Sequence, residues 1–292
     1  MKSICFFSSY YNGSNIPNYV EFYLLELKKH FSEIIFITNE KQLSVADEQF
    51  FRNQNIELMN VKNEGFDFGM WYKAFQRYDV TKYDRVGLIN DSSILFRNLD
   101  DFFDWTIKEP SDYCGIIDCN LHNYHVQSYF VIINKRAIPL VKDYFDRSGI
   151  ITNFKQVIMV YEIGLSTYLV NAEMSVKGYF SFKDADVGNP SWMKAKDLIK
   201  NGFPLVKKKI IARNYGESDY KGLVAGGFDP YPSHYFKLIR QIIGRDETNR
   251  IFAGVTQSKG LWGEIEFHTI CIIARLYGAL RRSYRKIRSK NH

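Results

Sequence analysis

Three sequence segments carry carboxylates whose surroundings suit chemistry. Asp67 lies in NEGFDFGMW, Asp91 in LINDSS and Glu162 in YEIGLS. A carboxylate can hold Mg²⁺ or Mn²⁺, which neutralises the charge of a departing phosphate. A single positioned carboxylate can also take the proton of an attacking hydroxyl group as a bond forms. The residue types therefore predict a group-transfer site, with Asp91 as the metal residue and Glu162 as the base.

Each of these carboxylates also has an ordinary structural explanation. Asp67 could cap a helix, Asp91 could form the turn after a strand, and Glu162 could complement the dipole of a first helical turn. A cap at Asp67 leaves the neighbouring Asn63 and Gly65 unexplained. A glycine at this position would let the backbone approach a ligand closely. For all three carboxylates both interpretations stay open.

Further polar residues accompany the carboxylates. Ser92 directly follows Asp91, and HVQSYF places His125 and Gln127 just before an apolar run. Side chains in such a strand-entry loop could bind hydroxyl groups of an acceptor or a phosphate. A lone histidine is more often a surface or core residue than a functional one, so this assignment also stays open.

An α/β sheet would bring these segments together. Apolar runs typical of buried strands alternate with helical spacing along the first part of the chain. Strands are predicted at 3–8, 33–38, 56–61, 85–89, 113–119, 128–134 and 175–182. Helices are predicted at 16–30, 68–78, 99–108, 137–145, 157–169 and 191–200. Ligands bind beyond the carboxyl ends of parallel strands, so we expect the loops after the first four strands to share one crevice.

Composition limits the class of protein. The chain has 292 residues, of which 46% are hydrophobic, and this excludes a largely disordered protein. The four cysteines show no CxxC spacing and are expected to be reduced thiols of a cytoplasmic protein. The first apolar run is too short for a secretory signal, and no stretch reaches the length of a membrane span.

Charge concentrates at the C-terminal end. The net charge is +7, and residues 275–292 contain seven Lys or Arg and no Asp or Glu, so the rest of the chain is balanced. This distribution argues against a nucleic-acid-binding surface. Residues 216–260 are predicted to be a linker with a short helix at 233–243. Residues 261–292 are predicted to form a basic amphipathic helix on an anionic membrane surface, although a helix packed on the domain would also fit.

Several segments together resemble the rhamnan synthesis F family of bacterial polysaccharide enzymes. They are NEGFDFGMW, LINDSS, HVQSYF, YEIGLS and GNPSWMKAKDLIKNGFPLVKKKII. The resemblance covers residues 1–215 and implies a GT-A-like glycosyltransferase domain with a Rossmann-type, mostly parallel sheet flanked by helices and followed by a C-terminal helical extension. It also implies a nucleotide-sugar donor and work on lipopolysaccharide O-antigen or capsule-type polysaccharide, often with rhamnose.

The resemblance also suggests roles for residues. The segment with Asn63, Gly65 and Asp67 corresponds to one that lies near the nucleotide. Asp91 and Ser92 are expected to bind the donor as well. Asp91 stands where related enzymes have a metal-binding Asp-x-Asp, but this chain has only one acid there. The lysines at 207–209 could contact phosphate or form a solvated face.

The resulting hypothesis is an inverting transfer from a nucleotide sugar to a polyprenyl-linked glycan, with Glu162 as base, at the inner face of the cytoplasmic membrane. The alternative is a non-catalytic carbohydrate-binding or scaffold subunit of a polysaccharide synthesis complex, which the single acid at Asp91 would permit.

Overall fold

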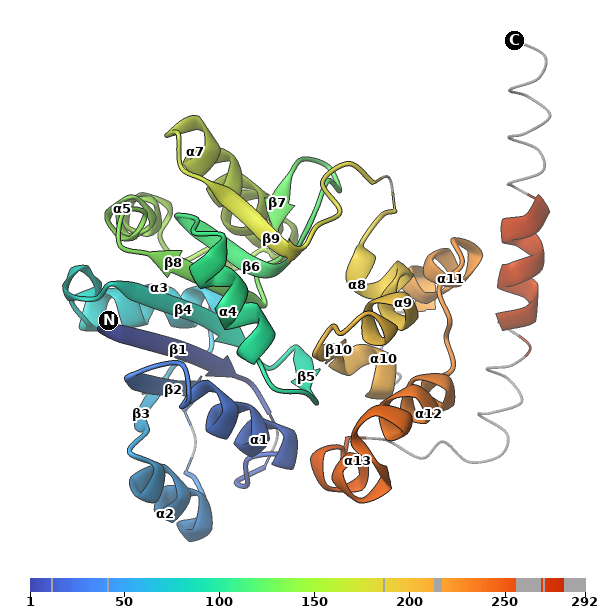
Figure 1. Cartoon of the computed structure of the whole chain (residues 1–292), viewed down its shortest axis with the longest axis horizontal. Helices are drawn as coiled ribbons and strands as arrows, with labels where there is room; N and C mark the ends of the chain where they lie inside the picture. The colour runs from blue at the N-terminus through green and yellow to red at the C-terminus, as the bar shows by residue number, and fades with distance from the viewer. Residues whose placement is uncertain are drawn as a thin grey trace.

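A mixed, mostly parallel β-sheet forms the centre of the molecule (Figure 1). The computed structural model describes residues 1–11, 13–40, 42–185, 187–212, 217–255, 269 and 271–280, with the backbone alone for 217–220. The strand order is β3-β2-β1-β4-β8-β6-β7, and β9 pairs with β6. The strands are β1 Ser3–Ser9, β2 Glu33–Asn39, β3 Glu57–Val61, β4 Arg85–Asn90, β6 Tyr113–Cys119, β7 His125–Val126, β8 Phe130–Asn134 and β9 Val176–Phe180.

The directions of the strands define one functional edge. Strands β1 to β4 are parallel to one another, whereas β8 runs antiparallel between β4 and β6. The carboxyl ends of β1, β2, β3 and β4 therefore meet at the same edge. The prediction of a mostly parallel sheet is confirmed.

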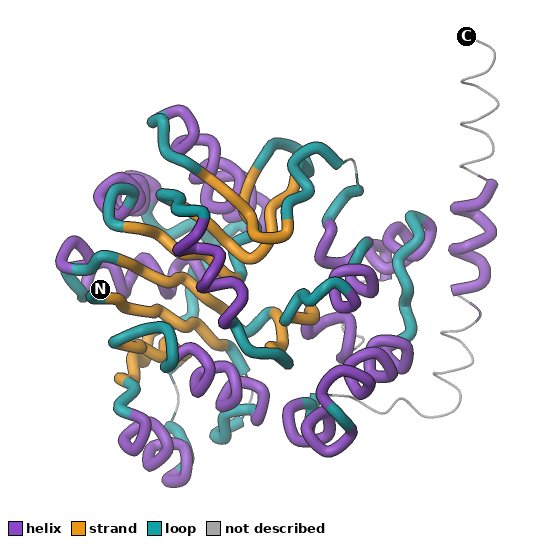
Figure 2. The backbone as a smooth tube through the Cα atoms, in the orientation of Figure 1, coloured by secondary structure: helices purple, strands orange, loops and turns teal. Residues whose placement is uncertain are grey.

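Helices cover both faces of this sheet, as Figure 2 shows. Side chains of a strand alternate between the two faces, so in β1 Cys5 and Phe7 belong to one core cluster and Ile4 and Phe6 to the other. The first cluster lies under α1 Asn18–Leu27, α2 Val45–Gln54 and α4 Asp100–Lys108. The second lies under α3 Phe66–Arg77, α5 Ile138–Ser148, α6 Phe154–Val157, the π-helix η2 Ile158–Gly164 and α7 Leu165–Asn171.

The C-terminal helices pack against the first face, on the right of the sheet in Figure 1. They are α8 Pro190–Met193, α9 Ala195–Lys200, α10 Lys208–Ala212, α11 Glu217–Ala225, α12 Pro232–Ile243 and α13 Arg245–Ile251. A short antiparallel pair, β5 Ser93–Leu95 with β10 Leu205–Lys207, joins them to the end of β4.

Two segments here differ from the prediction. The sequence predicted a linker on both sides of the helix at 233–243 within residues 216–260, yet the described parts form α11 and α13. Buried side chains explain the difference, because Val224, Phe228 and Ile251 join the same core as the sheet. Glycines at 226 and 227 follow α11, so the glycine-rich composition marks the end of a helix rather than a linker.

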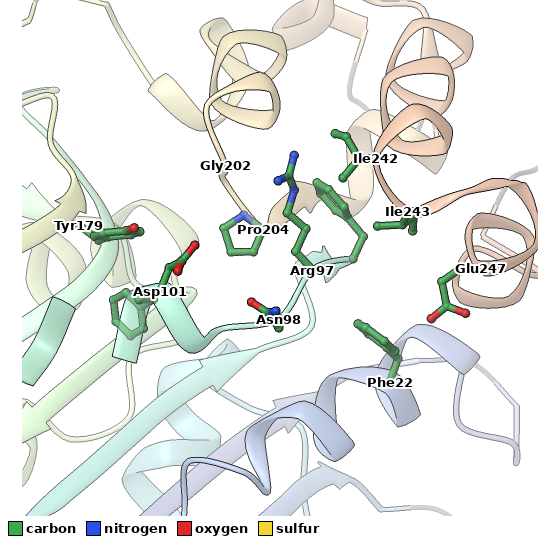
Figure 3. A pocket seen from close by; sticks show the side chains of 12 residues that line it. Phe22, Arg97, Asn98, Asp101, Tyr179, Gly202, Pro204, Ile242, Ile243 and Glu247 are labelled. Carbon is green, nitrogen blue, oxygen red and sulfur yellow. The ribbon is translucent and has the colours of Figure 1, made fainter. Parts of the chain in front are cut away.

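A pocket of about 460 Å³ lies between the sheet and these helices (Figure 3). Phe22 of α1 and Glu247 of α13 lie near each other in its lining, and Arg97 and Asn98 come from the segment between β5 and α4. None of the site residues expected from the sequence lines this pocket. It is a junction between the sheet and the C-terminal helices rather than the predicted crevice.

The described part of the predicted tail helix, residues 271–280, is helical and contacts the molecule on one side. Cys271 and Ala274 are buried, and a side chain at Gly278 would collide with the backbone of Ala225. Residues 261–268, 270 and 281–292 of this prediction, and 256–260 of the predicted linker, lie outside the described residues. Among the described helices, none combines the length and the apolar character needed to cross a bilayer.

Candidate active site

The carboxyl ends of β1 and β4 supply the first group of polar side chains. In the parallel register Phe7 pairs with Ile89 and Ser8 with Asn90, so both strands change from apolar to polar at the same level. The backbone N–H of Asp91 then donates to the carbonyl of Ser8 at 3.2 Å. This places the end of β4 directly beside the end of β1.

Asp91 is buried and bound by several donors. Its Oδ2 accepts hydrogen bonds from Ser9 Oγ at 3.0 Å and from the Tyr19 hydroxyl at 3.0 Å. Lys208 Nζ forms an ion pair with the same oxygen at 2.9 Å. Asp91 therefore lies beside an ammonium group. The interpretation of Asp91 as a turn residue alone does not account for these contacts.

Asp67 belongs to the same cluster. Its two carboxylate oxygens accept hydrogen bonds from Ser8 Oγ at 3.1 Å and from Asn90 Nδ2 at 2.7 Å. Helix α3 is capped by Gly65, so Asp67 lies in its first turn and points to the strand ends rather than capping the helix. Burial, followed by the charge of Asp91, raises the pKa of Asp67 to about 6, although the hydrogen bond from Ser8 and two lysines oppose this.

The loop before α3 depends on its glycines. Gly65 has a φ of +76°, in the left-handed region, and a Cβ on Gly69 would lie 1.9 Å from the Glu64 carbonyl oxygen. Asn63 is exposed at the start of this loop. Phe66 also has a positive φ, and its half-exposed ring contacts the exposed ring of Phe154 at 5.5 Å between centroids.

Glu162 lies in the π-helix η2 and is held by two residues that precede β8. Ser128 donates to Glu162 Oε2 through its hydroxyl and through its backbone N–H, the latter at 3.4 Å. His125 Nε2 lies 3.4 Å from Oε1. Burial favours the neutral acid, but the hydrogen bonds from His125 and Ser128 outweigh it, so the pKa of Glu162 lies below its ordinary value.

His125 and Gln127 are buried and bonded to protein groups. His125 Nδ1 donates to the Asn123 carbonyl at 2.8 Å, which leaves Nε2 for Glu162 and Cys119. Gln127 Nε2 donates to Asn189 Oδ1 at 3.1 Å, and Ser191 Oγ donates to Gln127 Oε1. Their surroundings favour positioning of Glu162 and of the 189–191 segment over direct contact with an acceptor or a phosphate.

Lys207 connects the two carboxylate groups. Its Nζ lies 3.4 Å from Ser92 Oγ and 3.4 Å from the centroid of the Tyr129 ring. Burial lowers the pKa of Lys207 to about 7, while the nearby charges of Glu162 and Asp67 raise it. The two carboxylates are carried by α3 and η2, which cover the same face of the sheet.

The solvated-face interpretation of the lysines fails for two of the three. Lys207 and Lys208 are partly buried and engage Ser92, Tyr129 and Asp91, whereas Lys209 is exposed. The backbone N–H of Lys208 donates to the Ser92 carbonyl at 2.9 Å, and Lys207 pairs with Ser93 in the β5–β10 ladder. The β5–β10 pairing therefore places both lysines next to the end of β4. The apolar residues around them in PLVKKKII were the only sequence signal of this burial.

A second group of potential metal ligands lies elsewhere among the described residues. His30 Nε2 is 3.6 Å from Glu26 Oε1 and 3.5 Å from Asp100 Oδ1. Glu26 follows Tyr19 by seven residues on α1, which separates it from the Asp91 cluster by about 10 Å along the helix axis. These residues were not predicted as a site and do not belong to the cluster of Asp67, Asp91 and Glu162.

The model of the family described as rhamnan synthesis protein F matches residues 34–224. This span contains all the carboxylates and lysines of the cluster. The chain belongs to the rhamnan synthesis protein F family. As a family member it is a glycosyltransferase of polysaccharide synthesis.

This family member is also similar to individual proteins. It is 24% identical over 231 residues to virulence protein VirA of Vibrio anguillarum, covering 64% of this chain and 68% of VirA. A putative nucleotide-diphospho-sugar transferase from Desulfovibrio desulfuricans is 14% identical, with a TM-score of 0.41. The match covers 82% of this chain and 98% of that protein. Streptococcus pneumoniae glycosyltransferase GlyE is 13% identical, with a TM-score of 0.40, and the match covers 84% of this chain and 64% of GlyE.

Proposed function

We propose that this protein transfers a sugar, with inversion, from a nucleotide sugar to a polyprenyl-linked glycan of O-antigen or capsule type. Rhamnose is the donor sugar that the family description favours. The observation that carries the proposal is the position of Lys207, whose Nζ contacts Ser92 Oγ and the Tyr129 ring. Ser92 follows Asp91 in the chain, and Tyr129 follows Ser128, which donates a hydrogen bond to Glu162. Carboxylates from separate elements thus share one edge of the sheet, where α/β proteins bind their ligands.

Glu162 is the proposed base. The acceptor hydroxyl oxygen attacks the anomeric carbon of the donor, the bond from that carbon to the diphosphate breaks, and the nucleoside diphosphate leaves. The proton of the hydroxyl group passes to the Glu162 carboxylate. The lowered pKa of Glu162 keeps this carboxylate ionised at neutral pH, ready to accept the proton as the new bond forms.

The residues around Glu162 have positioning roles in this proposal. Ser128 and His125 fix both carboxylate oxygens, and Gln127 links this region to Asn189 and Ser191. On the donor side, Asp67, Asp91 and Ser92 lie at the strand ends, with Asn63 and Gly65 in the loop that enters α3. This division assigns the acceptor to the Glu162 side and the donor diphosphate to the Asp91 side.

The Glu162→Gln variant tests the assignment of the base. It should bind donor normally and lose at least about 100-fold in sugar transfer, because the amide cannot accept the proton. The matched control is Glu109→Gln, whose exposed side chain pairs with Lys177. Donor binding and turnover would be measured with the nucleotide sugar that a panel screen identifies. Normal turnover by Glu162→Gln would refute the assignment.

The proposed location is the inner face of the cytoplasmic membrane. In the described helix at 271–280, five large apolar side chains are 56–70% exposed, while Cys271 and Ala274 are buried. The five are Ile272, Ile273, Leu276, Tyr277 and Leu280. The basic residues that follow in sequence from Arg281 would attract anionic headgroups.

Vesicle co-sedimentation tests this location. Wild-type protein should sediment with phosphatidylglycerol vesicles, and replacing Leu276 and Leu280 together by serine should weaken binding. Ile107→Ser, at an apolar residue of α4 that is 72% exposed, is the control and should bind normally. Equal sedimentation of all three proteins would contradict a role for this helix face.

A further inference from the structure

The surroundings of Asp91 do not fit a divalent cation. Mg²⁺ requires oxygen ligands at about 2.0–2.1 Å in octahedral geometry. Asp91 Oδ2 already accepts from Ser9, Tyr19 and Lys208 at 2.9–3.0 Å. A cation on this oxygen would meet the Lys208 ammonium group at short range, and the two like charges would repel each other.

The neighbouring carboxylate does not complete a metal site either. The position before Asp91 is Asn90, whose Nδ2 is a donor and gives its hydrogen bond to Asp67. The second oxygen of Asp67 accepts from Ser8. Both oxygens of Asp67 and Oδ2 of Asp91 therefore accept hydrogen bonds from protein donors, and a metal on any of these three oxygens would have to displace those bonds.

Positive charge is nevertheless present at this edge, and it comes from the protein. Lys208 Nζ contacts Asp91, and Lys207 Nζ lies near Ser92 Oγ and over the Tyr129 ring. Lys208 remains 28% exposed, so its ammonium group can reach both Asp91 and a bound anion. The β5–β10 pairing and the backbone hydrogen bond from Lys208 to Ser92 hold in place the backbone that carries both lysine side chains.

We infer that Lys207 and Lys208 bind the diphosphate of the donor in place of a divalent cation, with Asp91 positioning Lys208. This inference rests on the proposed function. An ammonium group can give several charge-assisted hydrogen bonds to phosphate oxygens and stabilise the charge of the leaving diphosphate. The single acid in Asn90-Asp91-Ser92 follows from this arrangement, because Asp91 pairs with a lysine and needs no second carboxylate.

Calorimetry with UDP, GDP and dTDP tests the inference on the full-length protein. Each nucleotide would be titrated once with EDTA and once with MnCl₂. At least one should bind, with dissociation constants that agree within about threefold between the two conditions. Binding that appears only with Mn²⁺ overturns the inference and leaves the proposed function intact. Absence of binding in both conditions overturns the proposed function, and the inference with it.

Variants identify the cationic group. Lys208→Met keeps most of the apolar stem and removes the charge, so it should weaken nucleotide binding by about tenfold or more. Lys209→Met, at the exposed neighbour, is the matched control and should bind like wild type. Unchanged binding by Lys208→Met overturns the inference. If Lys208→Met fails to fold, Lys208→Arg should still bind nucleotide in EDTA, and loss of that binding overturns it too.

Discussion

The buried carboxyl group of Asp67 allows a quantitative prediction for the Asp67→Asn variant. Its pKa rises from 3.8 to about 6, mainly through burial. At about 1.4 kcal/mol for each pKa unit, the ionised carboxylate costs the folded state about 3 kcal/mol above pH 7. The amide avoids this cost but weakens the hydrogen bond from Asn90, worth about 1 kcal/mol. The variant should therefore be about 2 kcal/mol more stable at pH 8.

The pH dependence gives the sign check. A carboxyl group with a raised folded pKa contributes stability below its unfolded pKa of 3.8 and loses that contribution as the pH rises through about 6. The advantage of Asp67→Asn should thus grow by about 2 kcal/mol between pH 4 and pH 8. Urea unfolding monitored by tryptophan fluorescence measures it. Asp104→Asn, at an exposed position of α4, is the control. An advantage that does not change with pH would refute the reasoning.

Three other outcomes follow from the same structure. Gly69→Ala should lower the melting temperature and donor affinity, since its Cβ would lie 1.9 Å from the Glu64 carbonyl oxygen, and thermal unfolding checks this. Ser128→Ala removes a bond that lowers the pKa of Glu162, so the acidic limb of the kcat/KM profile should move to higher pH. Nucleotide binding at pH 8 should take up close to one proton at Lys207, whose pKa of about 7 would rise beside an anion. Calorimetry in buffers of different ionisation enthalpy measures that uptake, and none in wild type would contradict it.

Much of the sheet could be predicted because its strands are buried on both faces. The predicted strand at 113–119 has the observed bounds of β6, and the starts at residues 3 and 33 match β1 and β2. The direction of β8 could not be predicted, because an apolar run looks the same in parallel and antiparallel strands. The helix predicted at 157–169 is helical, but its period does not distinguish the π-helix η2 from an α-helix.

The site was predictable only where it follows from strand ends. Asp91 comes directly after the buried strand β4, and Asp67 lies in the first turn of the helix that follows β3, so their meeting at one edge follows from parallel topology. Lys208 reaches Asp91 across 117 residues through the β5–β10 pairing, which no local pattern encodes. The burial of His125 likewise depends on Cys119 and Glu162, which lie on other elements.

The register between β1 and β4 explains why this site tolerates buried charge. The paired residues of both strands are apolar from Ile4–Val86 to Phe7–Ile89, and the next pair, Ser8 and Asn90, supplies the donors to Asp67. A slip of one residue would turn these donors to the opposite face and leave the carboxylate without them. An unpaired buried charge costs several kcal/mol, so the slipped register is strongly disfavoured. The same hydrogen bonds that hold the site therefore help to select the register of the sheet.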